Sequence, residues 1–505
     1  MPTGIMGLIT RKAPQFPEGA TWLNVGSPLS LSKLAGSVVV LDFWTYCCIN
    51  CMHMLPVLAK IEEKYKSLPV AVIGIHSAKY ENEADPNNIR EAISRYGIGH
   101  PVMVDGGMKL WRQYGISAWP TIVIISARGD VDYKIGGELT FEQLDGLVAD
   151  SLAKSKEMGS LGSKPPAIRS KLIKPRAATL SYPGKLSFCA DGSMFAISDS
   201  NHNRVLIIDS ATGKILSRAG GAGIGMSDGS FSQARFYRPQ GVLWRGNSIY
   251  VADTENHAIR IIDVSEQTVH TLAGTGEKGF YIGYGSVHEA KEAALNSPWD
   301  IASDGKSLFI AMAGLHQIWR YGIDDELIEP FAGNGREDIT DGELQEAEFA
   351  QPSGLWLQGQ ELYVADSETS SIRSVSIKDG YVGTLVGKGL FTFGDKSGSL
   401  PDTLLQHPLG LCASESTLYI ADTYNSSIKA INLKKKESET VISGKGKKAM
   451  CKIDDPKCDT LGLFEPNDVK INENVLYIVD TNNHLIRTFS LKGMLLNTLK
   501  LNEGV

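Results

Sequence analysis

Cysteine is scarce in this chain, with seven residues among 505. That number is too small for a domain held together mainly by disulfides. No uninterrupted apolar run approaches the roughly 18 residues that a membrane-spanning helix requires. Positive charge is not in excess, because 50 Lys and Arg stand against 57 Asp and Glu. The net charge of −7 argues against general nucleic-acid binding, so we expect neither a membrane nor a nucleic acid as a partner.

The first twenty residues lack the basic, apolar and small-residue order of a secretory signal. Hydrophobic residues make up 42% of the chain and charged residues 21%, which is an ordinary globular balance. These observations predict a folded, soluble protein of the cytoplasm.

Strand-like and helix-like segments alternate in the first third of the chain. Apolar runs predict strands, and apolar residues at helical spacing predict helices. The predicted strands are 37–44, 69–77 and 121–126, and the predicted helices are 54–68, 88–97 and 141–155. This order predicts an α/β domain over residues 14–155, followed by a Gly-, Ser- and Pro-containing linker over 156–174.

From residue 175 to 505, helical patterns disappear and one strand-rich unit recurs six times. Each copy opens with a proline and a small turn, and its second strand ends near an Ala-Asp pair. The opening prolines, 54 to 59 residues apart, are Pro183, Pro239, Pro298, Pro352, Pro408 and Pro466. Such a period predicts an all-β six-bladed propeller, which the last strand at 495–501 completes.

An aspartate recurs at one position of the repeat. It is read either as a ring of metal ligands or as a turn residue that bonds backbone amides. We favour the turn interpretation, because a structural requirement recurs in every blade. The residues are Asp199, Asp253, Asp366, Asp422 and Asp480, and the third copy has Met312 instead.

Long glycine-rich loops connect the copies and share one position in the repeat, so they gather on one face of the ring. Long loops often carry function, and we expect this face to dock a protein partner. The last loop contains Cys451 and Cys458, which form either a local disulfide or two separate surface thiols.

The strongest chemical signal is the segment VVVLDFWTYCCINCMHMLP at 38–56. A buried strand runs into Cys48, and a helix begins there. The partial positive charge of a helix N-terminus stabilises a thiolate, which makes Cys48 the expected nucleophile. Cys51 lies one turn further on and can resolve a mixed disulfide. Asp42 in the apolar strand is expected to be a buried acid that exchanges a proton with Cys51.

A second segment, SAWPT at 117–121, directly precedes a predicted strand. Pro120 lacks a backbone donor there, and a cis Trp119–Pro120 bond would allow the loop to press against the cysteines. Trp119 is expected on the substrate side of this loop. His76 ends its strand and is expected to face solvent.

These motifs resemble the thioredoxin-like fold of the TlpA and ResA type, with its buried aspartate, CxxC helix start and cis-proline loop. Followed by six NHL-type repeats, they resemble the NHL repeat-containing protein 2 family over about residues 14 to 501. The resemblance implies thiol–disulfide oxidoreductase activity, with Cys48, Cys51, Asp42, Pro120 and Trp119 at the site. No cofactor or resident metal is implied.

The segment departs from thioredoxin at Cys47, where tryptophan is usual, and at Ile49-Asn50, where Gly-Pro is usual. Cys47 is therefore either a third exchanging thiol or a buried neighbour. Two alternatives to the enzyme stay open. The propeller could be a binding scaffold with an accessory or redox-sensing thioredoxin-like domain. Alternatively, Cys47 and Cys51 form a CxxxC pair suited to handling Cu(I).

Overall fold

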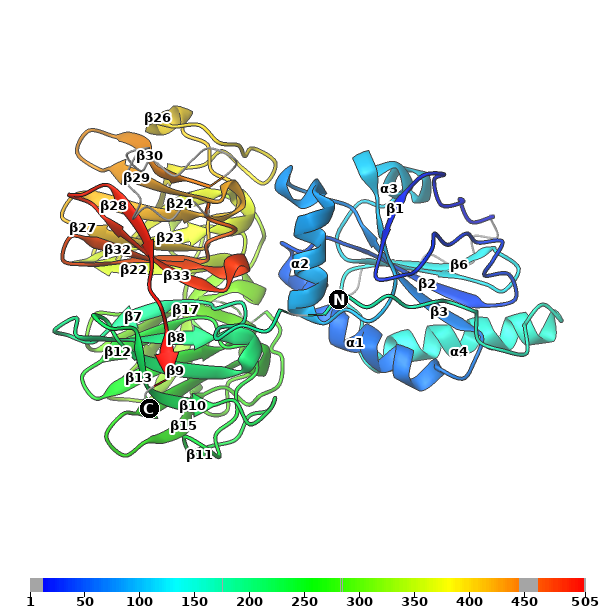
Figure 1. Ribbon diagram of the computed structural model, residues 1–505, viewed down its shortest axis with the longest axis horizontal. Coiled ribbons are helices and arrows are strands. Elements are labelled where there is room, and N and C mark those ends of the chain that lie inside the picture. The colour runs from blue at the N-terminus through cyan, green and yellow to red at the C-terminus, as the bar shows by residue number, and fades with distance from the viewer. Residues whose placement is uncertain (1–11, 175, 282, 284, 445–461, 504–505) are drawn as a thin grey trace. The chain divides into compact units, whose positions relative to one another are not determined.

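The computed structural model describes residues 12–174, 176–281, 283, 285–444 and 462–503 (Figure 1). The chain divides into two compact units, Met1–Pro175 and Arg176–Val505. Among the described residues, no helix combines the length and apolarity needed to cross a membrane.

The first unit is an α/β layer built on one six-stranded sheet with the order β1-β4-β3-β2-β5-β6. β2, β3 and β4 run parallel, whereas β1, β5 and β6 are antiparallel to their neighbours. The elements are β1 (Thr21–Leu23), β2 (Val38–Trp44), α1 (Ile49–Tyr65), β3 (Val70–His76), α2 (Pro86–Tyr96), β4 (Val102–Val104), α3 (Lys109–Tyr114), β5 (Thr121–Ile125), β6 (Val131–Gly136) and α4 (Phe141–Glu157).

The fully buried strand β2 divides its side chains between two cores. Val38 and Val40 pack with α1 and α4, whereas Val39, Leu41 and Phe43 pack on the opposite face of the sheet. This alternation follows from the two-residue period of a strand. Asp42 has the parity of Val38 and Val40, and it therefore lies on the sheet face that α1 covers.

The segment predicted as a linker packs on the first unit. The Gly162 amide donates to the Gly36 carbonyl, and the Gly26 amide donates to the Arg169 carbonyl. The Asn24 side chain accepts from the Ile173 amide. Residues 160–173 are thus bound to the α/β unit through backbone hydrogen bonds.

The second unit is the predicted six-bladed propeller, with one sheet for each blade (Figure 1). Blade one contains β7 (Leu186–Phe188), β8 (Met194–Asp199), β9 (Arg204–Asp209), β10 (Lys214–Gly220) and β35 (Asn502–Glu503). Blade two contains β11 (Gly229–Ser230), β12 (Val242–Arg245), β13 (Ser248–Asp253), β14 (Ala258–Asp263) and β15 (Thr268–Ala273). Blade three contains β16 (His288–Glu289), β17 (Pro298–Ser303), β18 (Ser307–Met312), β19 (Gln317–Gly322) and β20 (Leu327–Ala332).

Blade four contains β21 (Gly342–Glu343), β22 (Pro352–Gln358), β23 (Glu361–Asp366), β24 (Ser371–Ser376) and β25 (Tyr381–Val386). Blade five contains β26 (Gly398–Ser399), β27 (Gly410–Ser414), β28 (Thr417–Asp422), β29 (Ser427–Asn432) and β30 (Glu437–Ser443). Blade six contains β31 (Asp468–Asn472), β32 (Val475–Asp480), β33 (Leu485–Ser490) and β34 (Leu495–Thr498). The connecting loops are partly ordered, since β11, β16, β21 and β26 each add a short outer strand to a blade. Cys451 and Cys458 lie outside the described residues.

The recurring aspartates are structural, as predicted, but they bond a different partner from the one expected. Each is fully buried, and its Oδ1 accepts a backbone amide that lies eighteen residues earlier in the chain for Asp199 and sixteen residues earlier for the others, not an amide of the following turn. The donors are Ser181, Tyr237, Ala350, Gln406 and Phe464. The aspartates therefore hold the segment that enters each blade.

The hydroxyl residue after each aspartate bonds the backbone of the next blade. In five blades this hydroxyl donates to the carbonyl of the opening proline of the next blade, at 2.7–2.9 Å. The donors are Ser200, Thr254, Ser367, Thr423 and Thr481. Neighbouring blades are thus joined by one repeated bond, including blade six to blade one.

Blade three lacks both members of a buried ion pair. In blade two, Arg260 on β14 lies 3.0 Å from Asp253, and both side chains are fully buried. The corresponding residues of blade three are Met312 and the buried Trp319. The carboxylate and the cation are absent together, which avoids the cost of one unpaired buried charge.

Candidate functional site

The two cysteines of the CxxC segment lie at the start of α1, directly after β2 and a short loop. Cys48 is the N-cap residue, is partly exposed, and has no side-chain hydrogen bond to the helix. The Cys51 and Met52 amides donate to the Cys48 carbonyl at 3.1 and 3.2 Å. Cys51 is fully buried one turn later. An exposed thiol at the helix N-terminus beside a buried thiol is suited to stepwise thiol exchange.

The environment of Cys51 opposes a buried thiolate. Burial raises the pKa of Cys51 well above its usual range, and the neighbouring Cys48 thiol and Asp42 carboxylate raise it further. Burial raises the pKa of Asp42 to about 7. A carboxyl group with this pKa exchanges protons near neutral pH, which fits the acid–base role predicted for Asp42.

Further buried polar groups that the sequence analysis missed surround Asp42. Its carboxylate oxygens, the indole nitrogen of Trp44 and Nε2 of His100 have no hydrogen-bond partner within the described residues. A Cβ on Gly74 would lie 2.9 Å from Trp44 Nε1 and 3.3 Å from His100 Nε2. Gly74 is paired with Asp42 across β2 and β3, so these groups gather beside Asp42 under α1.

His76 contradicts its sequence prediction. It is buried, with its ring 4.9 Å from that of Trp44 and 5.5 Å from that of Tyr46, centre to centre. Burial lowers the pKa of His76 to about 3, so the ring is neutral. The strand end that was expected to face solvent is covered by the aromatic residues before the cysteines.

Glu83 holds the loop that carries Cys47, and it was also missed. Its buried carboxylate accepts the Cys47 amide at 2.9 Å and the Lys79 and Tyr80 amides at 3.0 and 3.1 Å. The Cys47 side chain is fully buried, with Sγ 3.9 Å from Thr45 Oγ1. Both predicted roles of Cys47 stay predictions, since Cys51 is buried to the same extent.

The predicted proline loop lies at the same end of the sheet. The Trp119–Pro120 bond is cis, as predicted. Thr121, the next residue, pairs with Phe43 near the end of β2, and this brings Pro120 to the strand end that leads to the cysteines. The partly exposed Trp119 donates from Nε1 to the Ser77 carbonyl and packs on Trp111 at 4.4 Å.

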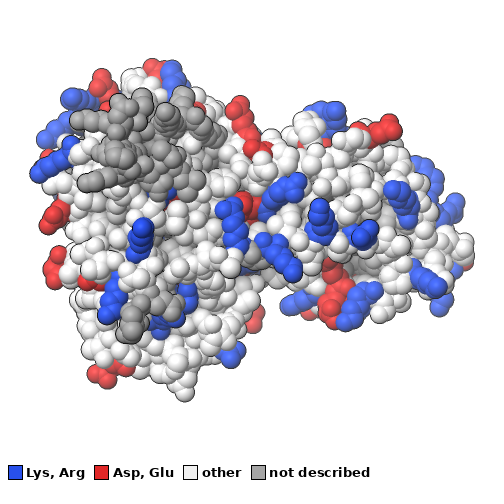
Figure 2. All heavy atoms as spheres, viewed as in Figure 1, with Lys and Arg blue, Asp and Glu red and all other residues white. Residues whose placement is uncertain are grey.

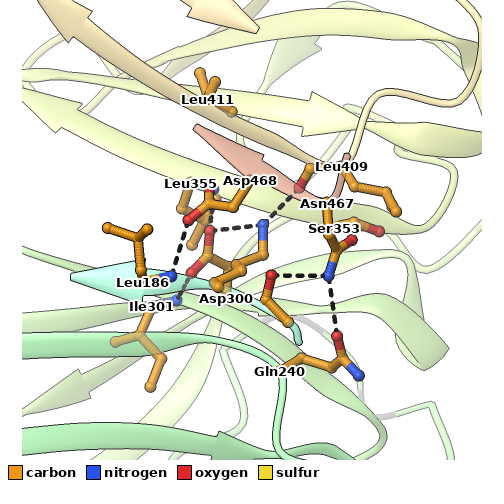
Figure 3. A network of polar contacts seen from close by, with 12 residues as sticks. Leu186, Gln240, Asp300, Ile301, Ser353, Leu355, Leu409, Leu411, Asn467 and Asp468 are labelled. Atoms are coloured by element: carbon orange, nitrogen blue, oxygen red, sulfur yellow. Dashed lines mark hydrogen bonds and ion pairs between the residues drawn. The ribbon is translucent and has the colours of Figure 1, made fainter. Parts of the chain in front are cut away.

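A second group of charges lies where the propeller blades meet (Figure 3). Lys185 Nζ is 3.2 Å from Asp300 Oδ2, and Lys470 Nζ is 2.7 Å from Asp468 Oδ1. The same carboxylates accept the amides of Leu186 and Leu355. The Lys185–Asp300 ion pair therefore joins blades one and three, and the two carboxylates join blade four to blade three and blade one to blade six through backbone amides. The pairing of opposite charges offsets the cost of their burial.

A cavity of about 260 Å³ adjoins this network. Phe188, Leu243 and Trp356 line it from three blades, together with Asp300 and Lys470. It is large enough for a small ligand or one side chain of a partner.

Two further observations concern the charged side chains of the surface and the possible metal ligands. On the drawn face, most of the surface is uncharged, and both Lys and Arg and Asp and Glu side chains are present (Figure 2). Within the described ranges, no group of three His, Cys, Asp or Glu residues could hold a metal ion.

Comparison with known proteins reveals relatives of both units together. The chain is 38% identical to NHL repeat-containing protein 2 of Gallus gallus over 525 residues, covering 97% of this chain and 71% of the relative. The chain belongs to the NHL repeat-containing protein 2 family. It is also 44% identical to SUPPRESSOR OF QUENCHING 1, chloroplastic, of Arabidopsis thaliana over 95% of its length, and it spans only 46% of that relative.

The first unit of this family member has relatives of its own. A thioredoxin-like family model matches residues 36–131. Thiol-disulfide oxidoreductase ResA of Bacillus anthracis is 33% identical over 142 residues, which cover 28% of this chain and 76% of ResA. In the propeller, an LVIVD repeat model matches residues 240–276 and 466–486.

Proposed function

We propose that the protein is a thiol–disulfide oxidoreductase whose propeller docks the protein that it acts on. The pairing of Cys48, partly exposed at the start of α1, with the buried Cys51 beside Asp42 carries this proposal. The similarity of the first unit to ResA supports it. A cytoplasmic location and a protein thiol or disulfide as substrate are parts of the same proposal.

The proposed reaction has two steps. The Cys48 thiolate attacks a substrate disulfide, one substrate sulfur leaves, and a mixed disulfide forms. Cys51 then gives its proton to Asp42 and attacks the Cys48 sulfur, which releases the second substrate sulfur as a thiolate. The Cys48–Cys51 disulfide holds the oxidation equivalents, and Trp119 and Pro120 face the substrate chain.

A redox titration of the full chain against glutathione mixtures tests the proposal. We expect one two-electron couple that is lost in Cys48→Ser and kept in Cys47→Ser. The position of the midpoint then tells a reductant from an oxidant. If wild type forms no Cys48–Cys51 disulfide across the range, the oxidoreductase proposal is wrong.

A scaffold function is the second candidate, and features of the propeller favour it. Ile224, Phe280 and Phe391 are exposed in three different connecting loops. Exposed apolar side chains on one set of loops are typical of protein interaction sites. Under this hypothesis the cysteines only sense redox conditions.

Partner capture separates the two candidates. An oxidoreductase traps substrates as mixed disulfides in Cys51→Ser, and the trapped proteins are released by reductant. A scaffold binds the same partners in Cys48→Ser and loses them when Phe280 and Phe391 are changed to Ser. Stoichiometric Cu(I) binding that is lost in Cys47→Ser would instead support the copper hypothesis.

A further inference from the structure

The polar groups beneath α1 form a connected set on one face of the sheet. Asp42 and Trp44 on β2 share a parity, and Gly74, the register partner of Asp42 on β3, shares their face. Gly74 leaves room for Trp44 Nε1 and His100 Nε2 to approach its Cα closely, which any larger residue would prevent. Two carboxylate oxygens, an indole N–H and an imidazole nitrogen thus meet in the interior without protein partners among the described residues.

His100 joins this interior set to the surface. Its side chain is only 3% exposed, and Nδ1 lies 3.2 Å from Oε2 of Glu62, a residue of α1 that is 31% exposed. Because the Glu62 carboxylate accepts the Nδ1 proton, Nε2 is the acceptor nitrogen of the neutral ring. Nε2 faces the buried groups. When the His100 ring is protonated, its charge lowers the pKa of Asp42 and so favours the charged carboxylate. An imidazole held in this way can take a proton on one nitrogen and release another from the second.

We infer that His100, oriented by Glu62, relays the proton of Asp42 to solvent during thiol exchange. The inference rests on the proposed oxidoreductase function and adds His100 and Glu62 to it as positioning residues that act through Asp42. Within the described residues no direct hydrogen bond joins Asp42 and His100, and the relay requires one buried water between them. The carboxylate, indole and imidazole groups offer such a water the two to four partners that it requires.

The relay completes the proton balance of the resolving step. Cys51 Sγ attacks Cys48 Sγ, the bond between Cys48 and the substrate sulfur breaks, and that sulfur leaves as a thiolate with the electron pair. The Cys51 proton moves to Asp42 and then through the water to His100 Nε2. The Nδ1 proton passes to Glu62 and to solvent, which returns Asp42 to its charged form.

The other groups around Asp42 do not offer this path. Trp44 is a donor only, and Cys48 and Cys51 are the reacting thiols. His76 is closed in between the Trp44 and Tyr46 rings, and neither of its nitrogens has a hydrogen-bond partner among the described residues. Among the described groups near Asp42, His100 alone connects it to a partly exposed carboxylate.

Single-turnover kinetics of the full chain test the relay. Reduced protein is mixed with oxidised glutathione, quenched with acid, and analysed for the mixed disulfide and the Cys48–Cys51 disulfide. We expect His100→Ala to slow the resolving step on the order of tenfold near neutral pH and leave the first attack unchanged. Glu62→Gln is expected to slow it less, and free imidazole to restore the rate of His100→Ala in proportion to its neutral form.

A matched control exists on α1, the helix that carries Glu62. His53 is also buried and its Nδ1 lies 2.8 Å from Glu138 Oε1, but it is not among the groups that act on Asp42. His53→Ala removes a comparable histidine–carboxylate pair, and we expect no imidazole-dependent change in the resolving step. Equal resolving rates in wild type and His100→Ala, or imidazole effects shared by both variants, would overturn the relay.

A second measurement separates failure of the relay from failure of the proposed function. The infrared band of protonated Asp42, assigned by its loss in Asp42→Asn, needs no exchange activity. We expect the band to shift in His100→Gln and not in His53→Gln. If the band has the same position in wild type and His100→Gln, the relay is wrong, even if the enzyme is active. If the band shifts but the chain forms no Cys48–Cys51 disulfide, the oxidoreductase function is wrong and the influence of His100 on Asp42 stands.

Discussion

A buried carboxyl group without a hydrogen-bond partner destabilises the fold when it is charged, and Asp42 is such a group. Its pKa rises from 3.8 to about 7 on burial, so the folded state binds a proton that the unfolded state has released between these values. The stability that neutral Asp42 contributes is fully present at pH values below its pKa in the unfolded state, 3.8. It is lost as the pH rises through its pKa in the folded state, about 7. A shift of about three units corresponds to about 4 kcal/mol.

Replacing Asp42 by Asn should therefore stabilise the first unit increasingly as pH rises. We expect little difference between Asp42→Asn and wild type near pH 4, and a difference of several kcal/mol in favour of the variant above about pH 8. Hydrogen exchange of amides in β2 and α1, measured by mass spectrometry on the reduced full chain, reports the local free energy of opening. A constant difference across this range would contradict the shifted pKa.

In contrast to Asp42, the buried carboxylate of Glu83 stabilises the fold, because it accepts hydrogen bonds from three backbone amides. Glu83→Ala leaves two buried amides and one partly buried amide unpaired, at a cost of about 3 kcal/mol. We expect the Cys47 loop to loosen and the buried Cys47 thiol to become open to alkylation. Peptide mapping after brief iodoacetamide treatment measures this, with the exposed neighbour Glu81→Ala as control. Protection of Cys47 in Glu83→Ala would refute the proposed role.

At the scale of the element, blade three shows how the propeller tolerates a missing ion pair. Asp253→Met removes the 3.0 Å partner of Arg260, which keeps Asp228 at 2.6 Å, and we expect a loss of about 1.5–3 kcal/mol in propeller stability. Asp253→Met with Arg260→Trp copies the natural pair of blade three, and we expect it to be more stable than Asp253→Met alone. Calorimetric unfolding of the two single variants and the double variant completes this double-mutant cycle. Strict additivity would show that the two positions are independent.

The same scale shows which elements the sequence could predict. The periodic segment of α4 and the fully buried strands β2 and β5 were predicted within two residues of their observed bounds. The helix α1 begins next to the cysteines, as expected, but it ends at Tyr65, three residues before the end of the predicted segment. β1 and β4 have three residues each, and β6 is only half-buried at the sheet edge, so none of them carries a clear period. Their strand structure depends on pairing with neighbours that are distant in sequence.

The site residues also fall into two groups, those that local sequence predicted and those that tertiary packing brings to the site. Cys48, Cys51, Asp42 and Pro120 were found because local sequence places them at a strand end, a helix start and a loop. Glu83 and His100 were missed because their partners, the Cys47 amide and Glu62, are 36 and 38 residues away. His76 was misplaced because the aromatic cover from Trp44 and Tyr46 comes from a different strand and loop. Contacts of this kind follow from tertiary packing, which a single sequence does not encode in any spacing.

At the scale of the whole molecule, the propeller has one junction, between blade six and blade one, at which the chain end is held in the next blade only by non-covalent bonds. Blades one to six follow each other in the chain, so each internal junction has a covalent link beside it. Blade six meets blade one through the Thr481 hydroxyl on the Pro183 carbonyl, His484 Nδ1 on the Tyr182 amide, and Asp468 on the Leu186 amide. The chain end adds only β35, which pairs with β10.

This asymmetry predicts unequal effects for one substitution at equivalent positions. Thr254→Val and Thr481→Val each remove a hydroxyl that bonds a proline carbonyl in the next blade, worth about 1 kcal/mol and leaving one buried acceptor unpaired. At the internal junction the loop from blade two to blade three still keeps the blades together. At the closing junction the same loss lowers the free energy of ring opening. We therefore expect amides of β7 and β31 to exchange several-fold faster in Thr481→Val than in wild type. Amides of β13 and β17 should change less in Thr254→Val. Equal changes at both junctions would mean that the side-chain and backbone bonds between blades, rather than chain connectivity, determine how the ring opens.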